Sequence, residues 1–143
     1  MTEPVERFNA EPSVSNHFAW LRTRLALERS FMAWMRTSVS LIGFGFTITQ
    51  FFTRLREMEG GAARPMAIEA PRDLGLTLIA AGVGALAISA WQYRDGIKYL
   101  WSAPFQAIAG AEKSPIRTPV FISAMILIGI GVAAFAAVFF RWT

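Results

Sequence analysis

Residues 120–140, VFISAMILIGIGVAAFAAVFF, form an apolar run of 21 residues that contains no charged side chain. A helix needs roughly 20 residues, at about 1.5 Å each, to cross a bilayer core about 30 Å thick. Two further runs lack Asp, Glu, Lys and Arg: residues 37–52, with 16 residues, and residues 74–91, with 18. The sequence therefore predicts an all-α integral membrane protein that crosses the bilayer three times.

The composition excludes most soluble classes of protein. Of the 143 residues, 54% are hydrophobic and 17% are charged, and the mean hydropathy is +0.39, whereas about a quarter of the residues in soluble domains are charged. The segments between the apolar runs are too short to bury cores of their own. A separate soluble catalytic domain is excluded, and we expect no nucleic-acid partner despite the formal net charge of +4.

The sequence also lacks the residue patterns on which enzymes depend. It contains no cysteine and one histidine, whereas a metal site needs several ligands of this kind. The G-x-S-x-G, phosphate-loop and dinucleotide-binding motifs are absent. We therefore expect no enzymatic activity, no catalytic residue, no metal and no cofactor.

The predicted organisation is a disordered or weakly ordered leader at residues 1–14 followed by a single membrane domain at residues 15–143. Ser15 or Asn16 is predicted to cap an amphipathic cytoplasmic helix. This helix either continues into the first span or bends near Ser30. The three predicted spans cover about residues 33–53, 74–92 and 119–140.

The cytoplasmic helix has a predicted apolar face and a predicted interfacial aromatic residue. The spacing of its apolar residues predicts a face made of Phe18, Leu21, Leu25 and Met32. Trp20 is expected at the level of the lipid headgroups. His17 is expected to be solvated, and Glu28 is expected to pair with Arg24, one helical turn away.

Small residues predict the packing faces of the second and third spans, because they let helices approach closely within a bilayer. These small-residue stripes are Ala81, Ala85 and Ser89 in the second span and Gly129, Ala133 and Ala137 in the third. The first loop, from residue 53 to residue 73, is predicted to be irregular because it contains Gly60, Gly61, Pro65 and Pro71.

The distribution of Lys and Arg predicts the orientation. The N-terminal segment and the second loop share one side of the membrane and carry eight of these residues, whereas the other side carries five. Since cationic loops stay in the cytoplasm, the N-terminus is predicted to be cytoplasmic and the C-terminus exterior.

Polar residues follow one face of the first helix at heptad-like spacing. At about 100° per residue they fall within a sector about 80° wide. An arginine in lipid costs a few kcal/mol, and polar groups there turn toward partners or water. We therefore predict that this face, the polar seam, meets other subunits, a water-filled axis or anionic headgroups. The seam consists of Arg22, Arg29, Arg36, Ser40, Gly43, Thr47, Gln50 and Arg54.

A simpler interpretation of the polar seam stays open. Its arginines are then interfacial cations that extend toward the headgroups, and Ser40, Gly43 and Thr47 are ordinary small packing residues. Glu28 is the carboxylate nearest to the seam, so one protomer offers few acidic groups to neutralise it.

Residues 22–45, RTRLALERSFMAWMRTSVSLIGFG, contain a specific motif. The stretch resembles the leading helix of the YidH-like family, small bacterial inner-membrane proteins of unknown function with the approximate pattern L-A-x-E-R-T-x-L-A-W-x-R-T. Ser30 replaces the usual Thr and Met32 the usual Leu. The matching residues are Leu25, Ala26, Glu28, Arg29, Ala33, Trp34, Arg36 and Thr37.

The resemblance implies a location in the bacterial inner membrane with a cytoplasmic N-terminus. The same type of domain forms the membrane part of the vacuolar transporter chaperone complex, in which several copies surround a route for polyphosphate. An arginine-lined first helix suits such a route.

Two functions follow as expectations. In the first, at least three copies form an anion or polyanion pathway: Arg22, Arg29 and Arg36 attract the anion, and Ser40, Gly43, Thr47 and Gln50 line the route. In the second, the protein is a non-conducting scaffold or assembly subunit in which the arginines and Glu28 join protomers. The expected partners are the lipid bilayer, further copies of the chain, and an anionic ligand or lipid headgroup.

Overall fold

The computed structural model describes residues 11–58, 66–110 and 119–140, and every regular element in these ranges is a helix. The all-α prediction is confirmed. Three helices are long and apolar enough to cross a membrane: α1 (Val14–Met58), α2 (Met66–Leu100) and α4 (Pro119–Phe140). A short 3₁₀ helix, η1 (Ala103–Phe105), and a single turn, α3 (Gln106–Ala109), follow α2.

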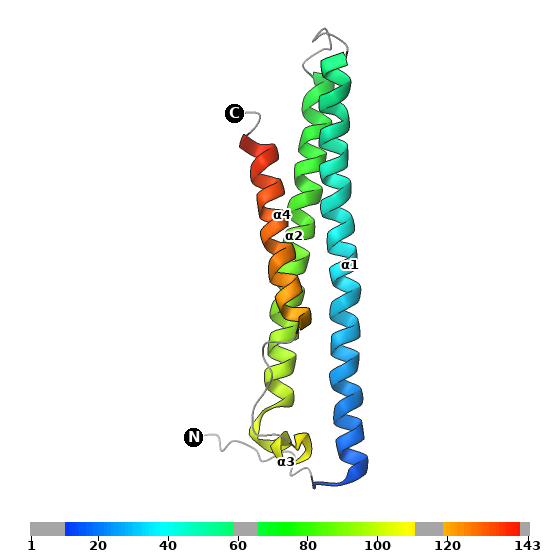
Figure 1. The fold of residues 1–143 in the computed structure, drawn as a ribbon, viewed down its shortest axis with the longest axis vertical. Coiled ribbons are helices and arrows are strands. Elements are labelled where there is room, and N and C mark those ends of the chain that lie inside the picture. Colours follow the sequence, from blue (N-terminus) through cyan, green and yellow to red (C-terminus); the bar gives the residue numbers. More distant parts are fainter. Residues whose placement is uncertain (1–10, 59–65, 111–118, 141–143) are drawn as a thin grey trace.

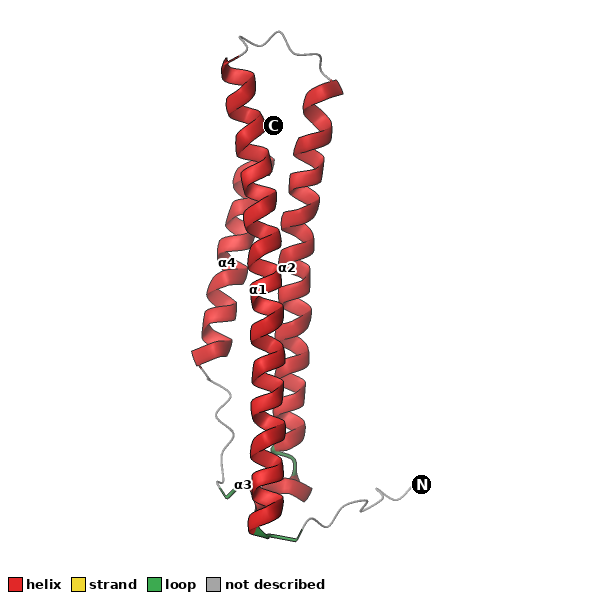
Figure 2. Cartoon of the chain, turned by 90° about the vertical axis from the view of Figure 1, so that its right-hand side faces the viewer, coloured by secondary structure: helices red, strands yellow, loops and turns green. Residues whose placement is uncertain are grey.

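The two longest helices form an antiparallel hairpin, and α4 lies beside part of it (Figure 1). α4 runs parallel to α1 and begins about midway along the hairpin. Below that point α1 and α2 continue without α4 to the end where α3 lies, as Figure 2 also shows. We call this two-helix part, residues 14–29 and 95–100 together with η1 and α3, the stalk.

α1 is one uninterrupted helix of 45 residues, about 67 Å long at 1.5 Å per residue. The bend that the sequence allowed near Ser30 does not occur. The N-cap is Ser13, whose Oγ accepts a hydrogen bond of 3.1 Å from the backbone N–H of Asn16, so Ser15 and Asn16 were the wrong residues for this role. The leader's residues 1–10 lie outside the described part of the chain.

The first loop is shorter than predicted. α1 continues to Met58, α2 begins at Met66, and Pro71 lies inside α2. Pro71 is the sixth residue of α2 and has no N–H, so one intrahelical hydrogen bond is missing near the start of this helix. Gly60, Gly61 and Pro65 lie outside the described residues. α4 matches the predicted third span, and the other two predicted spans lie within α1 and α2.

Glycines bring the helices into close contact at the middle of the bundle. A Cβ added to Gly45 would lie 2.5 Å from the carbonyl oxygen of Gly75. A Cβ at Gly82 would lie 2.8 Å from the carbonyl oxygen of Ser38, and one at Gly131 would lie 2.6 Å from the Val83 side chain. Small residues therefore set the helix spacing, as expected for helices that pack in a bilayer.

The predicted small-residue stripe of the second span packs within this chain only in part. Ser89 is buried, Ala85 is half-buried and Ala81 is exposed. In the third span the whole stripe is exposed, and a Cβ at Gly129 would meet nothing within 4 Å. α4 is apolar all round, so composition alone did not distinguish its faces. Its buried face is Ala124, Gly131 and Val138.

An aromatic cluster closes the end of the stalk. Trp20 is buried, and its Nε1–H donates a hydrogen bond of 2.9 Å to the carbonyl oxygen of Leu100. Trp101 packs edge-on against Trp20, with ring centroids 5.4 Å apart. Trp20 is thus a packing residue within the chain, and its predicted level at the lipid headgroups stays a prediction. Phe18, Leu25 and Met32 are exposed, so the predicted apolar face does not pack within the described chain.

His17 joins α1 to α3. Its Nδ1 lies 2.6 Å from the carbonyl oxygen of Ile108, and since a carbonyl oxygen can only accept, Nδ1 carries the hydrogen. The ring also stacks on Trp20 with an interplanar angle of 15°. His17 is thus a structural residue and not the solvated side chain that the sequence predicted.

Candidate functional site

Close contacts fix the levels of α1 and α2 relative to each other. Phe31 stacks on Tyr93 with ring centroids 4.7 Å apart. Further along, Ile42 contacts Gly82 and Thr49 contacts Gly75. Moving one residue toward the C-terminus of α1 therefore corresponds to moving one residue toward the N-terminus of α2. For any residue of one helix, the residue of the other helix at the same height along the bundle can be identified.

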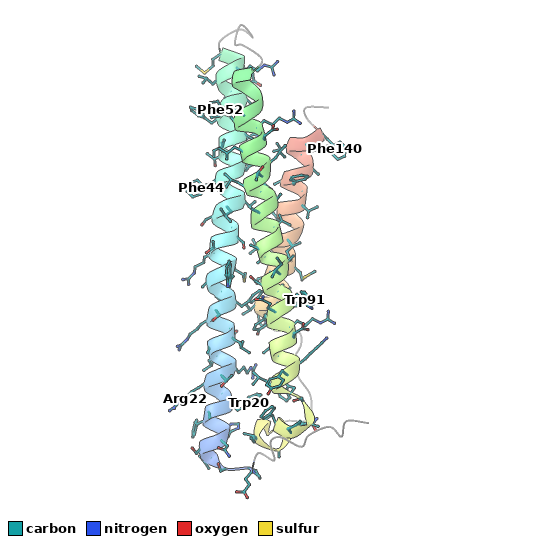
Figure 3. The ribbon with its side chains drawn as sticks, turned by 180° about the vertical axis from the view of Figure 1, so that it is seen from behind. Trp20, Arg22, Phe44, Phe52, Trp91 and Phe140 are labelled. Atoms are coloured by element: carbon teal, nitrogen blue, oxygen red, sulfur yellow. The ribbon has the colours of Figure 1, made fainter. Side chains whose placement is uncertain are left out.

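The structure places the polar seam on the face of α1 that points away from α2. Gln50 is half-buried, and the other seven seam residues are exposed. A Cβ at Gly43 would meet nothing within 4 Å, and Figure 3 shows Arg22 on the outer side of α1 while Trp20 points toward the bundle. No described part of the chain covers the seam. The buried residues of α1 are Trp20, Phe31, Ser38, Gly45 and Thr49.

Arg36 lies at a level where both neighbouring helices are uncharged. Gly131 of α4 packs against Ile42, and because α4 and α1 are parallel, Pro119 lies level with Ser30. Arg36 is six residues beyond that level, about 9 Å at 1.5 Å per residue. An exposed guanidinium beside uncharged, apolar helices in a bilayer needs an oxygen partner or must extend toward the membrane surface.

The seam hydroxyls near the middle of α1 bond within their own helix. Ser40 Oγ donates to the carbonyl oxygen of Arg36 at 2.9 Å, and Thr47 Oγ1 donates to that of Gly43 at 2.8 Å. Such bonds satisfy a hydroxyl without water or another helix. Arg36 therefore has the strongest need for a partner from outside the described chain.

Glu28 and Arg24 do not form the predicted ion pair in the described structure. The Arg24 guanidinium lies instead 5.9 Å from the centroid of the Trp20 ring, a cation–π arrangement. Glu28 is half-buried beside the seam. Its predicted role at a subunit contact stays a prediction.

Two acidic residues that the sequence analysis did not single out lie on the outer face of α2. Asp73 and Asp95 are both exposed, and the residues of α2 that contact α1 lie on the opposite side of that helix. The sequence does hold an indication of this shared face. Asp73 and Asp95 are 22 residues apart, close to six helical turns of 3.6 residues, so a helix places them on one side.

A groove of about 360 Å³ lies at the end of the stalk, separate from the seam. No charged side chain lines it, so it is unsuited to an anion. Within the described ranges, no three potential metal ligands lie close enough together to hold an ion. The groove is lined by Asn16, Ala19, Trp20, Thr23, Tyr99, Leu100, Phe105 and Ile108.

Part of the chain matches a known protein family. Residues 19–98 match the family described as "Domain of unknown function (DUF202)". The match contains the whole polar seam and both acidic residues of α2, and it ends before α4. No curated protein and no solved structure matches the chain.

Proposed function

This chain belongs to the DUF202 family, a domain of unknown function, and we propose that it is a homo-oligomeric membrane subunit that binds an anion through the arginines of α1. The observation that carries the proposal is the place of Arg36, which is exposed on a face that no described helix covers, at a level where α2 and α4 are uncharged.

The chemistry of the seam favours a phosphate-type anion. Guanidinium groups bind phosphate oxygens through two parallel hydrogen bonds, and these charge-assisted bonds are about twice as strong as neutral ones. Arg22 and Arg29 precede Arg36 at intervals of seven residues, so a polyanion can contact more than one of them. This agrees with the YidH-like resemblance and with the polyphosphate route that it implies.

The length of the polar seam favours the assembly of several copies of the chain. The seam extends from Arg22 to Arg54, about 48 Å at 1.5 Å per residue, which exceeds the hydrocarbon core. A lone protomer would expose much of it to lipid. We propose at least three copies in the bacterial inner membrane, with Gly43 and Thr47 in the same surface as the arginines.

Replacing Arg36 by alanine is expected to weaken the binding of long-chain polyphosphate by about 10-fold to 100-fold, since a hydrogen bond to a charged group contributes about 1.5–3 kcal/mol. Binding isotherms on the protein in mild detergent measure this. Arg94→Ala is the matched control, because Arg94 is an exposed arginine of α2 outside the seam. Equal affinity of both variants and the parent protein would contradict anion binding by Arg36.

A non-conducting scaffold is the second candidate function. It is favoured by the hydroxyls of Ser40 and Thr47, which are satisfied within α1 and need no water-filled route. The same variants separate the candidates when native mass is also measured. An intact oligomer with weakened binding supports the anion site, whereas dissociation of the Arg36→Ala oligomer supports the scaffold.

The orientation is tested independently. We propose a cytoplasmic N-terminus because eight Lys and Arg residues lie on its side of the membrane against five on the other. Reporter fusions after Arg7 and after Thr143 are expected to be active in the cytoplasm and the exterior, respectively. A cytoplasmic reporter at Thr143 would reverse the assignment.

A further inference from the structure

We infer that neighbouring copies of the chain pack head-to-tail, with the α1 seam of one copy against the outer face of α2 of the next, and that Arg29 of one copy pairs with Asp95 of its neighbour. The inference rests on the homo-oligomer proposed above and identifies its contact surface. The same contact gives Arg36 no acidic partner, because the residues of the neighbouring α2 at its level are uncharged.

The first argument is that Arg29 and Asp95 lie at the same level. Phe31 stacks on Tyr93, and counting two residues back on α1 and two forward on α2 places Arg29 opposite Asp95. Copies related by a rotation axis perpendicular to the membrane share one depth. A residue can then meet only those residues of a neighbour that lie near its own level.

The second argument is that these two residues face opposite ways. Arg29 lies on the face of α1 turned away from α2, and Asp95 lies on the face of α2 turned away from α1; both are exposed. Within one copy they cannot meet. Between copies placed side by side in a ring they come together, as in heterologous interfaces that close by rotation.

At the other end of the span, a second pair of opposite charges also lies at a similar level and faces opposite ways. Arg54 lies on the seam, and Asp73 lies on the outer face of α2, both exposed. Since Thr49 contacts Gly75, Asp73 is level with Phe51, three residues or about 4.5 Å from Arg54. An arginine side chain is long enough to cover this offset, so both ends of the interface are complementary.

A symmetric contact between two α1 helices is disfavoured. Parallel copies would place each arginine of the seam opposite the same arginine of its neighbour, and juxtaposed like charges disfavour an interface. Within the copy Asp95 pairs with Lys98, with Oδ1 and Nζ 4.0 Å apart, but both side chains are 53% exposed. Such surface pairs contribute little.

Thiol cross-linking of the full chain tests the interface. The chain has no cysteine, so only the introduced cysteines can react with the cross-linker. The double variant Arg29→Cys/Asp95→Cys, treated with a short bis-maleimide, is expected to give a ladder of covalent multimers, whereas Arg29→Cys alone is expected to give none. A bis-maleimide is preferred because a disulfide needs Cα atoms within about 7 Å.

The matched control is Arg22→Cys/Asp95→Cys, because Arg22 lies on the same face about 10 Å further along α1. It is expected to give no ladder. Covalent dimers from Arg29→Cys alone would overturn the head-to-tail arrangement in favour of a symmetric α1 contact. Equal ladders from both double variants would also overturn it.

Charge reversal provides a second readout that does not depend on the cysteine variants. Arg29→Asp and Asp95→Arg are each expected to shift the native mass toward monomer, and the double variant is expected to restore the oligomer. The native mass of the parent protein tests the homo-oligomer separately from this particular interface. A parent oligomer without rescue or ladder overturns this interface alone, whereas a parent monomer overturns the oligomer as well.

Discussion

Replacing Gly45 by leucine is expected to separate α1 from α2 and to lower the free energy of unfolding by at least about 3 kcal/mol. Overpacking of a core costs about 1–3 kcal/mol when neighbours can shift. Here the first Cβ would already lie 2.5 Å from the backbone oxygen of Gly75 and 2.8 Å from Ile79. Backbone cannot rotate aside, so the whole helix must move.

Gly129→Leu is the control for this prediction. Gly129 is exposed on α4, outside the polar seam, and a Cβ there would meet nothing within 4 Å. Both substitutions gain helix propensity, by up to about 1 kcal/mol relative to glycine. SDS titration of the detergent-solubilised protein, followed by helix content and by protease resistance, is expected to show a lower midpoint for Gly45→Leu only. Equal midpoints would contradict the close approach at Gly45.

Replacing Trp20 by alanine is expected to cost about 3–5 kcal/mol, the usual range for removing a buried aromatic side chain. The loss has two parts: the packing against Leu100 and Trp101, and the hydrogen bond to the Leu100 carbonyl oxygen. Because Trp20 lies at the end of the stalk, the loss is local. Hydrogen exchange is expected to accelerate in residues 14–29 and 95–109 while the α4 contact stays protected.

Two variants give this prediction its controls. Trp20→Phe keeps most of the buried area and loses the N–H donor, so its effect is expected to be intermediate. Trp34→Ala removes a tryptophan from the same helix that is 52% exposed and is expected to leave exchange in the stalk unchanged. Stalk exchange that is equal in Trp20→Ala and Trp34→Ala would show that Trp20 does not hold the stalk end.

The membrane helices and the direction of the seam could be predicted from the sequence because both depend on local periodicity. α4 required only the absence of charge over residues 119–140, and the outward position of Arg36 followed from its place on a helical wheel. The roles of Trp20 and His17 could not be predicted, because their partners are about 80 to 90 residues away along the chain. A single sequence does not show such contacts.

The packing glycines show the same difference between features that follow from local sequence and features that depend on contacts between helices. Gly43 and Gly45 are two residues apart and have the same composition around them, yet one is open and the other touches backbone. Which glycine packs depends on the register between α1 and α2, and that register is fixed by Phe31 on Tyr93 and Thr49 on Gly75. Asp95 was overlooked for the same reason, since its relation to Arg29 exists only once the register is known.

Because α1 is continuous, the spacing between its arginines is fixed. Arg22, Arg29 and Arg36 lie on one helix that has no break between Val14 and Met58, so their Cα atoms are held about 10 Å apart at 1.5 Å per residue. No hinge in α1 can shorten these intervals, and no tilt of the helix changes them. With Arg29 paired to Asp95 of the neighbouring copy, Arg22 and Arg36 remain for the ligand, about 21 Å apart at 1.5 Å per residue. A single phosphate ion cannot contact both, whereas a chain of linked phosphates can.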